Sequence, residues 1–251
     1  MHPKEPLAIA HVDAEQGFSG GEAQVFLLME GLRARGHRNV LLAPPGSASV
    51  SEAARRGLEV RAVAMRGDLD AAAVLGLRRA LAALRVDVVH LHTGRATWLG
   101  GLAARWAGLT AITTRRQDRR LSSSMRTRLV YGRLVRRVAA ISPAVARRLE
   151  EGGVERGRLV TIPSAVDPAA LVPHRSRAEV RAELGLAEGE FVVLTLAALV
   201  PRKGVDVLIE GCARLGRGAT LLVAGDGPER ARLEELSARC ATGVRDRKSV
   251  V

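Results

Sequence analysis

The chain has 251 residues, of which 47% are hydrophobic, 2% aromatic and 26% charged, and its formal net charge is +13. This hydrophobic content excludes wholesale disorder, and the length suits one large α/β domain or one domain and part of another. The scarcity of aromatic rings and the dispersal of the arginines along the chain argue against a nucleic-acid-binding module, which stacks bases on aromatic side chains.

Short apolar runs alternate with amphipathic stretches from the N-terminus onward. We predict strands at 7–12, 40–43, 60–64, 86–91, 111–114, 138–141 and 159–162, and a second series at 191–196 and 220–224. Alternation of strands and helices indicates parallel sheets that are covered on both faces. The predicted fold class is therefore α/β, built from Rossmann-like domains.

The stretch GFSGGEAQVFLLMEGLRARGH (17–37) follows the first predicted strand. Its apolar side chains recur at i, i+3, i+4 and i+7, which predicts a helix over 22–35. Gly20 and Gly21 precede this helix, in a position where glycines let the backbone approach a ligand and where helix N–H groups suit an anion such as a diphosphate. A tight strand-to-helix turn without a ligand is an equal alternative, because a lone glycine pair is not a dinucleotide fingerprint.

Two histidines alternate at the end of the predicted strand 86–91, in the sequence VVHLHT. His92 lies nearer the carboxyl end of the strand, where α/β proteins bind ligands, and is our candidate for a catalytic residue. The alternative for His90 and His92 is a structural role in packing at the sheet edge, since histidine is often partly buried.

The alternation breaks between 167 and 190, in a polar segment that contains proline and lacks a strand pattern. We predict a complete N-terminal Rossmann-like domain over 1–170, a linker over 171–189 and the first βα units of a second Rossmann-like domain over 190–245. Two predicted strands are fewer than a free-standing doubly wound sheet needs, so this second domain is expected to be incomplete.

Arg202 and Lys203 follow the strand predicted at 191–196 and precede a glycine and an amphipathic helix. Two cations in this place could neutralise a diphosphate, and the alternative is a pair of solvated surface cations. The later motif GDGPER (225–230) lacks the third glycine of the dinucleotide fingerprint, which argues against a nicotinamide or flavin site. Cys212 and Cys240 are isolated from one another and predict neither a disulfide framework nor a zinc site.

Five motifs occur in a recognisable order: SGGEAQVFLLMEGLRARGH, VDVVHLHT, VAAISPAVARRL, VTIPSAVD, and LVPRKGVDVLIEGCARL with LLVAGDGPERARLEEL. In order and spacing they resemble the retaining glycosyltransferases of group 1 (glycosyltransferase family four), which have the GT-B fold. The resemblance extends over 7–240. It implies transfer of a sugar from a nucleotide-diphosphate-sugar donor to a hydroxyl acceptor, with an N-terminal domain that binds the acceptor and a C-terminal domain that binds the donor.

Carried over to this sequence, the resemblance puts Gly20, Gly21 and Lys203 near the donor diphosphate. It also implies that no metal ion and no cofactor are required. Many relatives have an arginine where Ala198 stands here, and Arg202 is expected to supply part of that charge. Some relatives place a catalytic histidine where Arg115 stands, and we therefore include Arg115 as a candidate that could contact a phosphate or an anionic acceptor.

Many relatives also carry Asn-Gly before the Val-Asp of the fourth motif, in a turn that requires positive φ. Ser164 and Ala165 occupy these positions here, which leaves that turn in doubt. Nothing after 240 resembles the acidic motif of the family, and residues 246–251 (DRKSVV) match the translation of a common sequencing-library adapter. We expect this tail to be non-native, and the chain to be a C-terminally truncated fragment that is inactive alone and poorly soluble.

The expected partners are a nucleotide-sugar donor and a lipid-linked or saccharide acceptor, with a role in cell-envelope polysaccharide or glycolipid synthesis and no nucleic acid. The arginine-rich segment 113–137 favours peripheral contact with an anionic membrane. No signal peptide and no membrane-spanning run is apparent, so we expect a cytoplasmic protein, in part on the inner membrane face. The alternative function is a non-catalytic nucleotide- or sugar-binding α/β protein.

Overall fold

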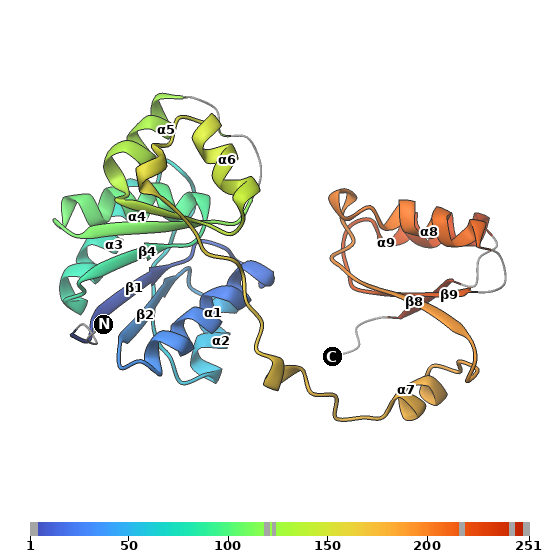
Figure 1. Ribbon diagram of the computed structural model, residues 1–251. Coiled ribbons are helices and arrows are strands. Elements are labelled where there is room, and N and C mark those ends of the chain that lie inside the picture. The colour runs from blue at the N-terminus through green and yellow to red at the C-terminus, as the bar shows by residue number, and fades with distance from the viewer. Residues whose placement is uncertain (1–4, 118–120, 122–123, 216–218, 241–243, 248–251) are drawn as a thin grey trace. The chain divides into compact units, whose positions relative to one another are not determined.

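A computed structural model describes residues 5–117, 121, 124–215, 219–240 and 244–247 (Figure 1). The chain divides into two compact units, Met1–Asp167 and Pro168–Val251. Each unit contains a parallel sheet, as the strand–helix alternation predicts. The two units are described separately below.

The first unit is built on a seven-stranded sheet in the order β3-β2-β1-β4-β5-β6-β7, in which every pair of neighbours is parallel. Its strands are β1 (Ala8–Val12), β2 (Arg38–Ala43), β3 (Glu59–Ala62), β4 (Val88–Leu91), β5 (Thr110–Arg115), β6 (Arg137–Ala140) and β7 (Leu159–Thr161). All seven strands predicted for this region are confirmed, with boundaries that differ by no more than a few residues.

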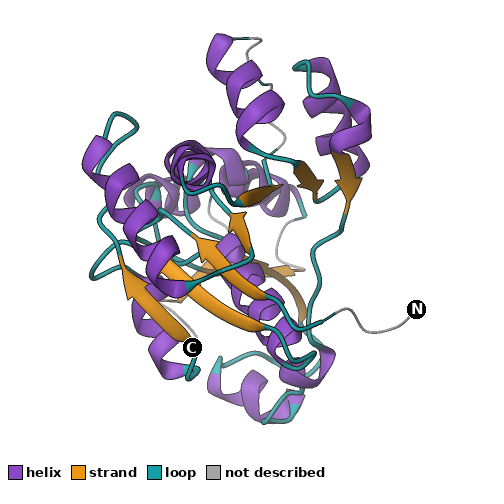
Figure 2. Cartoon of the chain, turned by 90° about the vertical axis from the view of Figure 1, so that its left-hand side faces the viewer, coloured by secondary structure: helices purple, strands orange, loops and turns teal. Residues whose placement is uncertain are grey.

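Helices cover both faces of this sheet (Figure 2). They are α1 (Gly20–Arg33), α2 (Ala48–Arg55), α3 (Ala71–Leu84), α4 (Gly94–Trp106), α5 (Met125–Leu129), the π-helix η1 (Val130–Leu134), α6 (Pro143–Glu151) and the 3₁₀ turn η2 (Arg156–Arg158). Helices α3, α4 and α6 pack on one face, and α1 and α2 pack on the other. Because side chains alternate along a strand, each strand contributes to both cores.

Helix α1 begins two residues before the predicted start at 22 and ends two before the predicted end at 35. The reason is a capping box. The Ser19 hydroxyl accepts a hydrogen bond from the backbone of the first turn, and the Glu22 carboxylate accepts one from the Ser19 N–H at 2.7 Å. This reciprocal pairing satisfies helix-terminal donors and recruits Gly20 and Gly21 into the first turn. The glycine pair is thus the start of the helix rather than a loop ahead of it.

The second unit has a three-stranded parallel sheet in the order β10-β9-β8, made of β8 (Phe191–Leu196), β9 (Ala219–Ala224) and β10 (Val244–Arg247). Its helical elements are the 3₁₀ turns η3 (Pro168–Leu171) and η4 (Pro201–Lys203) and the helices α7 (Arg177–Glu183), α8 (Val205–Arg214) and α9 (Arg230–Arg239). Helices α8 and α9 pack on β8 and β9 around Leu199, Ile209 and Leu221. On the edge strand β8, Leu194 and Leu196 are exposed.

Two details of this unit were not predicted. The segment 171–189, predicted as a linker, contains α7, because Ser176 and Glu179 form a second capping box. Strand β10 includes the first two residues of the tail that was predicted to be non-native, and it pairs with β9 through Asp246 and Arg247. The rest of that tail, 248–251, lies outside the described residues.

The glycines of GDGPER serve the packing of two backbone segments. The loop 225–227 lies against 197–199, where Ala197 N–H donates to the Ala224 carbonyl at 3.0 Å and Leu199 N–H to the Asp226 carbonyl at 2.8 Å. A Cβ at Gly225 would overlap the carbonyl oxygen of Ala197. The motif therefore needs glycine for close backbone approach within the fold.

We expect the Gly225→Ala substitution to lower the free energy of unfolding of the second unit by about 3 kcal/mol, because the backbone must shift to relieve this overlap. Far-UV circular dichroism in urea measures the change. Trp98 and Trp106 both lie in the first unit, so their fluorescence transition should stay in place. Gly211→Ala in α8 is the matched control, since its Cβ meets open space. Equal stabilities of the two variants would contradict the packing role.

Candidate functional site

The strand order of the first sheet reverses between β1 and β4. From β1 the chain moves outward to β2 and β3, and it then crosses back to β4 on the other side of β1. In open parallel sheets, ligands bind outside the carboxyl ends of the two strands at such a point. The segments that follow β1 and β4 are therefore the place where a site is expected.

Three histidines gather at this point, on the face of the sheet that α1 covers. His11 on β1 lies opposite His90 on β4 in the parallel register, and His92 follows β4 directly. All three are buried, with exposed fractions of 0%, 8% and 5%. The rings of His11 and His92 are stacked with centroids 5.2 Å apart, and those of His90 and His92 are 4.2 Å apart.

Hydrogen bonds connect these imidazoles to each other and to neighbouring strands. His11 Nδ1 lies 3.0 Å from His92 Nε2, and His11 Nε2 lies 3.0 Å from Asn39 Oδ1 on β2. His90 Nε2 lies 2.7 Å from Thr114 Oγ1 on β5. The two predicted histidines are thus part of a larger buried cluster. His11 and Asn39 were missed in the sequence, although both stand at positions of their strands that share a face with His90.

Burial holds the three histidines in the neutral state at physiological pH. Loss of solvation lowers the pKa of His11 to about 4, with a smaller opposing contribution from the hydrogen bond with Asn39. Desolvation, followed by the repulsion of nearby His11 and Arg116, lowers the pKa of His90 to about 3. For His92 the same desolvation and the neighbouring His90, His11 and Arg116 lower the pKa well below its ordinary value.

One ring nitrogen from each histidine lies within 4.8 Å of the others, so the cluster has the ligand type of a transition-metal site. The nitrogens of His11 and His92 that face each other, however, are at hydrogen-bond distance. That contact accounts for the approach of these two rings without an ion. The expectation that the protein works without a metal stays a prediction.

Gly20 and Gly21 form the first turn of α1 beside this cluster. Neither has a positive φ, and a Cβ added to Gly20 would meet no atom within 4 Å. A Cβ at Gly21 would make only ordinary contacts, at 3.6 Å to Ser19 Oγ and 3.8 Å to Arg116 Cδ. Neither backbone conformation nor packing requires glycine at these two positions. Because Gly20 and Gly21 have no side chains, they leave free space at the N-terminus of α1, where an anion binds favourably.

Arg116, rather than the predicted Arg115, is the arginine that faces this space. Arg116 continues the alternation of Ile112 and Thr114 on β5, and its Nη1 donates to the carbonyl oxygen of His92 at 3.4 Å. Arg115 points the other way, where its Nε donates to the Gln117 carbonyl at 3.1 Å and its guanidinium bonds the Tyr131 hydroxyl. The role proposed for Arg115 is untested, but its side chain lies on the α4 side of the sheet, away from the histidines.

Two buried carboxyl groups complete the surroundings of Arg116. Asp13 follows β1 and Glu22 lies in the first turn of α1, with exposed fractions of 1% and 6%. Burial raises the pKa of Asp13 to about 6, against hydrogen bonds from the Glu15 N–H and the Ser49 hydroxyl. Desolvation lowers the pKa of Arg116, and both carboxylates counteract this effect. The site therefore carries a guanidinium that two acids stabilise inside the fold.

The segment after β7 is attached to α1 beside this site. Gln24 Nε2 donates to the Ala165 carbonyl at 2.7 Å, and the Ala165 N–H donates to Gln24 Oε1 at 2.9 Å. Neither Ser164 nor Ala165 has positive φ, so the positive-φ turn that the sequence left in doubt is absent at these two residues, and the double hydrogen bond with Gln24 holds the segment instead. A cavity of about 330 Å³ opens there, lined by residues of α1 and of β4 to β7 that include His90, Thr114 and Arg116.

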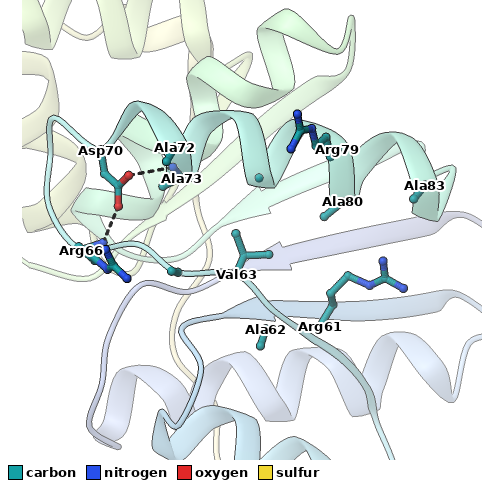
Figure 3. Close-up of a pocket in the computed structure, with 12 residues that line it drawn as sticks. Arg61, Ala62, Val63, Arg66, Asp70, Ala72, Ala73, Arg79, Ala80 and Ala83 are labelled. Atoms are coloured by element: carbon teal, nitrogen blue, oxygen red, sulfur yellow. Dashed lines mark hydrogen bonds between the residues drawn. The ribbon is translucent and has the colours of Figure 1, made fainter.

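A larger hollow of about 580 Å³ lies between β3 and α3, at the other end of the sheet (Figure 3). Small side chains of α3, such as Ala72, Ala80 and Ala83, leave this groove open. Asp70 lies at one end and caps α3, accepting from the N–H groups of Ala73 at 2.9 Å and Arg66 at 3.0 Å. This hollow lies beside the edge strand β3, away from the strand reversal between β1 and β4. It is therefore a less suitable ligand site than the histidine cluster.

Arg202 and Lys203 belong to the second unit. They belong to η4 and are exposed, directly ahead of Gly204, which has a φ of 63° and is the N-cap residue of α8. Their side chains therefore stand at the N-terminus of α8, as the sequence predicts. Their proposed contact with a diphosphate is untested.

We expect acid to destabilise the first unit. The folded pKa values of the three histidines lie below the ordinary value, so the unfolded chain binds more protons and the free energy of unfolding falls as the pH drops below about 6.5. Asp13 acts in the opposite sense, because its folded pKa is raised to about 6 and the folded chain takes up its proton first. Each histidine contributes roughly 2 kcal/mol between pH 7 and pH 5.

Urea titrations followed by tryptophan fluorescence at pH 7, 6 and 5 measure this slope. The Asp13→Asn variant removes the opposing group, and its loss of stability should exceed that of the unaltered chain by about 1 kcal/mol. A free energy of unfolding that is constant across this range would show that the histidines are not held neutral in the fold.

Comparison with known proteins places this geometry in a family. Residues 18–170 match the model of Glycosyltransferase Family 4, and residues 176–245 match that of Glycosyl transferases group 1. A D-inositol 3-phosphate glycosyltransferase of Nocardia farcinica is 38% identical over 98 residues, which are 37% of this chain and 21% of that protein. An alpha-D-kanosaminyltransferase of Streptomyces kanamyceticus is 40% identical over 77 residues, 30% of this chain and 19% of that protein. The matches thus span about a fifth of each relative.

Solved structures agree on the fold. The Anabaena protein Alr3699/HepE in complex with UDP-glucose superposes with a TM-score of 0.83 at 18% identity, over 98% of this chain and 70% of that chain. A glycosyltransferase of Rickettsia africae superposes with a TM-score of 0.82 at 19% identity, over 98% of this chain and 69% of that chain. The predicted α/β fold class of the GT-B type is confirmed. Among the described residues, none of the helices has the length and hydrophobicity to cross a bilayer.

The match to the family model covers more than half of the chain, it contains the glycine pair, His90 and His92, and the fold agrees with it. The chain belongs to glycosyltransferase family 4.

Proposed function

We propose that this chain is the acceptor-side unit and part of the donor-side unit of a glycosyltransferase that moves a sugar from a nucleotide-diphosphate-sugar to a hydroxyl acceptor. The observation that carries the proposal is the open turn at Gly20 and Gly21. It stands at the point of strand reversal, next to Arg116, in a chain of this family. Complexes of a protein of similar fold, Alr3699/HepE, with UDP-glucose and with UDP support a nucleotide-sugar as the donor.

The chemistry required of such a site is stabilisation of a departing nucleotide diphosphate. In the first unit, the helix N-terminus at Gly20 and the guanidinium of Arg116 supply positive potential. In the second unit, we assign the same task to Arg202 and Lys203 at the N-terminus of α8. These positive charges would stabilise the departing diphosphate without a metal ion. We propose retention of configuration, with a diphosphate oxygen taking the proton of the acceptor hydroxyl on the same face of the sugar.

We propose a role in cell-envelope polysaccharide or glycolipid synthesis, on a lipid-linked or saccharide acceptor. Two proteins of similar fold support it, namely a lipopolysaccharide outer core galactosyltransferase and a glycosyltransferase involved in lipopolysaccharide biosynthesis. A cytoplasmic location, with contact to the inner membrane face through the arginines of 113–137, belongs to the same proposal. The resemblance implies further donor-binding residues beyond 240, so we propose that these 251 residues bind the donor without turnover.

We expect the Gly20→Val substitution to weaken binding of UDP-glucose at least tenfold. Its side chain fills the free space above the first turn of α1, and it prevents close approach of the diphosphate to the helix N–H groups. Titration of UDP-glucose into the labelled chain, followed by NMR, measures the dissociation constant even when binding is weak.

Gly31→Val on the same helix is the matched control, since a Cβ there meets only the flexible end of Arg35 at 3.5 Å. This variant should bind as the unaltered chain does. Equal affinities of the Gly20 and Gly31 variants would remove the glycine pair from the donor site. Absence of any binding by the unaltered chain would contradict the proposed function.

A further inference from the structure

A chain of hydrogen bonds leads from the backbone of β2 to the buried imidazole of His92. Asn39 Nδ2 donates to the carbonyl oxygen of His37 at 3.0 Å, and Asn39 Oδ1 lies 3.0 Å from His11 Nε2. His11 Nδ1 in turn lies 3.0 Å from His92 Nε2. A histidine ring nitrogen can either donate or accept, so the direction of each bond must be derived from the ends of the chain.

The first end is unambiguous, because the carbonyl oxygen of His37 can only accept. The Asn39 amide must therefore turn its NH₂ group toward that oxygen and its own carbonyl oxygen toward His11. That oxygen also can only accept, so the proton of this contact belongs to Nε2 of His11. The opposite orientation of the amide would place two oxygens against one another.

The rest of the chain follows from the neutrality of the rings. Burial lowers the pKa of His11 to about 4, so near neutral pH its ring carries one proton, which is on Nε2. Nδ1 of His11 is then a bare acceptor, and its bond with His92 requires the proton to be on Nε2 of His92. His92 is neutral for the same reason, and its Nδ1 is left with an unprotonated lone pair.

Two polar atoms remain unsatisfied at this end of the chain. Nδ1 of His92 and Nε of Arg116 are both buried and without a hydrogen-bond partner among the residues that the structure describes. Arg116 lies beside His92, since its Nη1 donates to the backbone carbonyl of His92 at 3.4 Å and its charge acts on the pKa of the His92 imidazole. One of the two atoms can only accept and the other can only donate. A hydroxyl group between them would satisfy both, by donating its proton to the imidazole and accepting from the guanidinium.

We propose that His92 Nδ1 and Arg116 Nε form a binding site for one hydroxyl group, that of a sugar ligand or of a water molecule, and that Asn39 and His11 are positioning residues which fix the tautomer of His92 for it. The sugar assignment rests on the proposed function, while the tautomer assignment stands without it. The site selects for a hydroxyl, because an aliphatic group would leave both atoms unsatisfied and buried.

Long-range ¹⁵N–¹H NMR of the histidine-labelled chain at pH 7 tests the tautomers directly, since protonated and unprotonated ring nitrogens have well-separated resonances. We expect both His11 and His92 to carry the proton on Nε2. A proton on Nδ1 of His92 would overturn the proposal. Loss of the Nε2 protons of both His11 and His92 on addition of Zn²⁺ would also overturn it, because that result would mark a metal site instead.

Two variants separate positioning from general packing. Asn39→Leu keeps the size of the side chain and removes the amide, so His11 loses its orienting partner and His92 should show a mixture of both tautomers. Thr114→Val is the matched control: it removes the partner of His90, another buried histidine of the cluster, and should leave the tautomer of His92 unchanged. Identical His92 spectra in the two variants would overturn the positioning role of Asn39 and His11.

Titration with UDP-glucose and with UDP identifies the occupant. A shift of His92 Nδ1 with UDP-glucose and not with UDP supports a sugar hydroxyl. If UDP-glucose shifts the Gly20 and Gly21 amides and leaves His92 Nδ1 unchanged, donor binding stands and the sugar assignment is overturned, with water as the occupant. If neither responds, the sugar assignment fails together with the proposed function. The response of the Gly20 and Gly21 amides thus distinguishes the two failures, and the tautomer assignment is judged by its own measurement.

Discussion

The parallel pairing of β1 with β4 is the constraint on which the rest of the site depends. It places His11 opposite His90 and brings His92 to the carboxyl end of the sheet, under the first turn of α1. Because side chains alternate along a strand, a slip of one residue in this register would turn the imidazoles into the apolar core under α3 and α4. From β1 and β4 that core includes Ala10, Val12, Val89 and Leu91, which hold the register by their own burial.

The same pairing buries polar groups that must then satisfy one another. Asn39, His11 and His92 do so in sequence, and His90 does so through Thr114. The arrangement stabilises the neutral imidazole and leaves a bare acceptor and an unpaired donor at one end, beside the open turn at Gly20. Unsatisfied buried atoms lower stability, and natural proteins retain them mostly at functional sites. The site and its sensitivity to acid thus have one physical origin.

Much of the fold could be predicted from the sequence, because the strands are short apolar runs and the helices have clear periodicity. His92 and the glycine pair were proposed as site residues from their places at the ends of elements, and the structure places both at the carboxyl end of the sheet. Arg115 was taken as a site candidate because it stands where some relatives have a catalytic histidine. The alternation of side chains along β5 instead turns Arg116 toward the histidines. His11 and Asn39 were not predicted, since their role depends on the order of strands in space, which no local pattern contains. Helix α7 was overlooked although Ser176 and Glu179 have the spacing of a capping box.

A map of backbone amide shifts on addition of UDP tests the central claim most directly, because it asks where on the first unit a nucleotide diphosphate binds. We predict that the largest shifts fall on Gly20, Gly21 and Arg116, which follow the carboxyl ends of β1 and β5. The groove between β3 and α3, which contains Arg61 and Arg79, should stay unchanged. Shifts confined to that groove, with none at the glycine pair, would contradict the placement of the site.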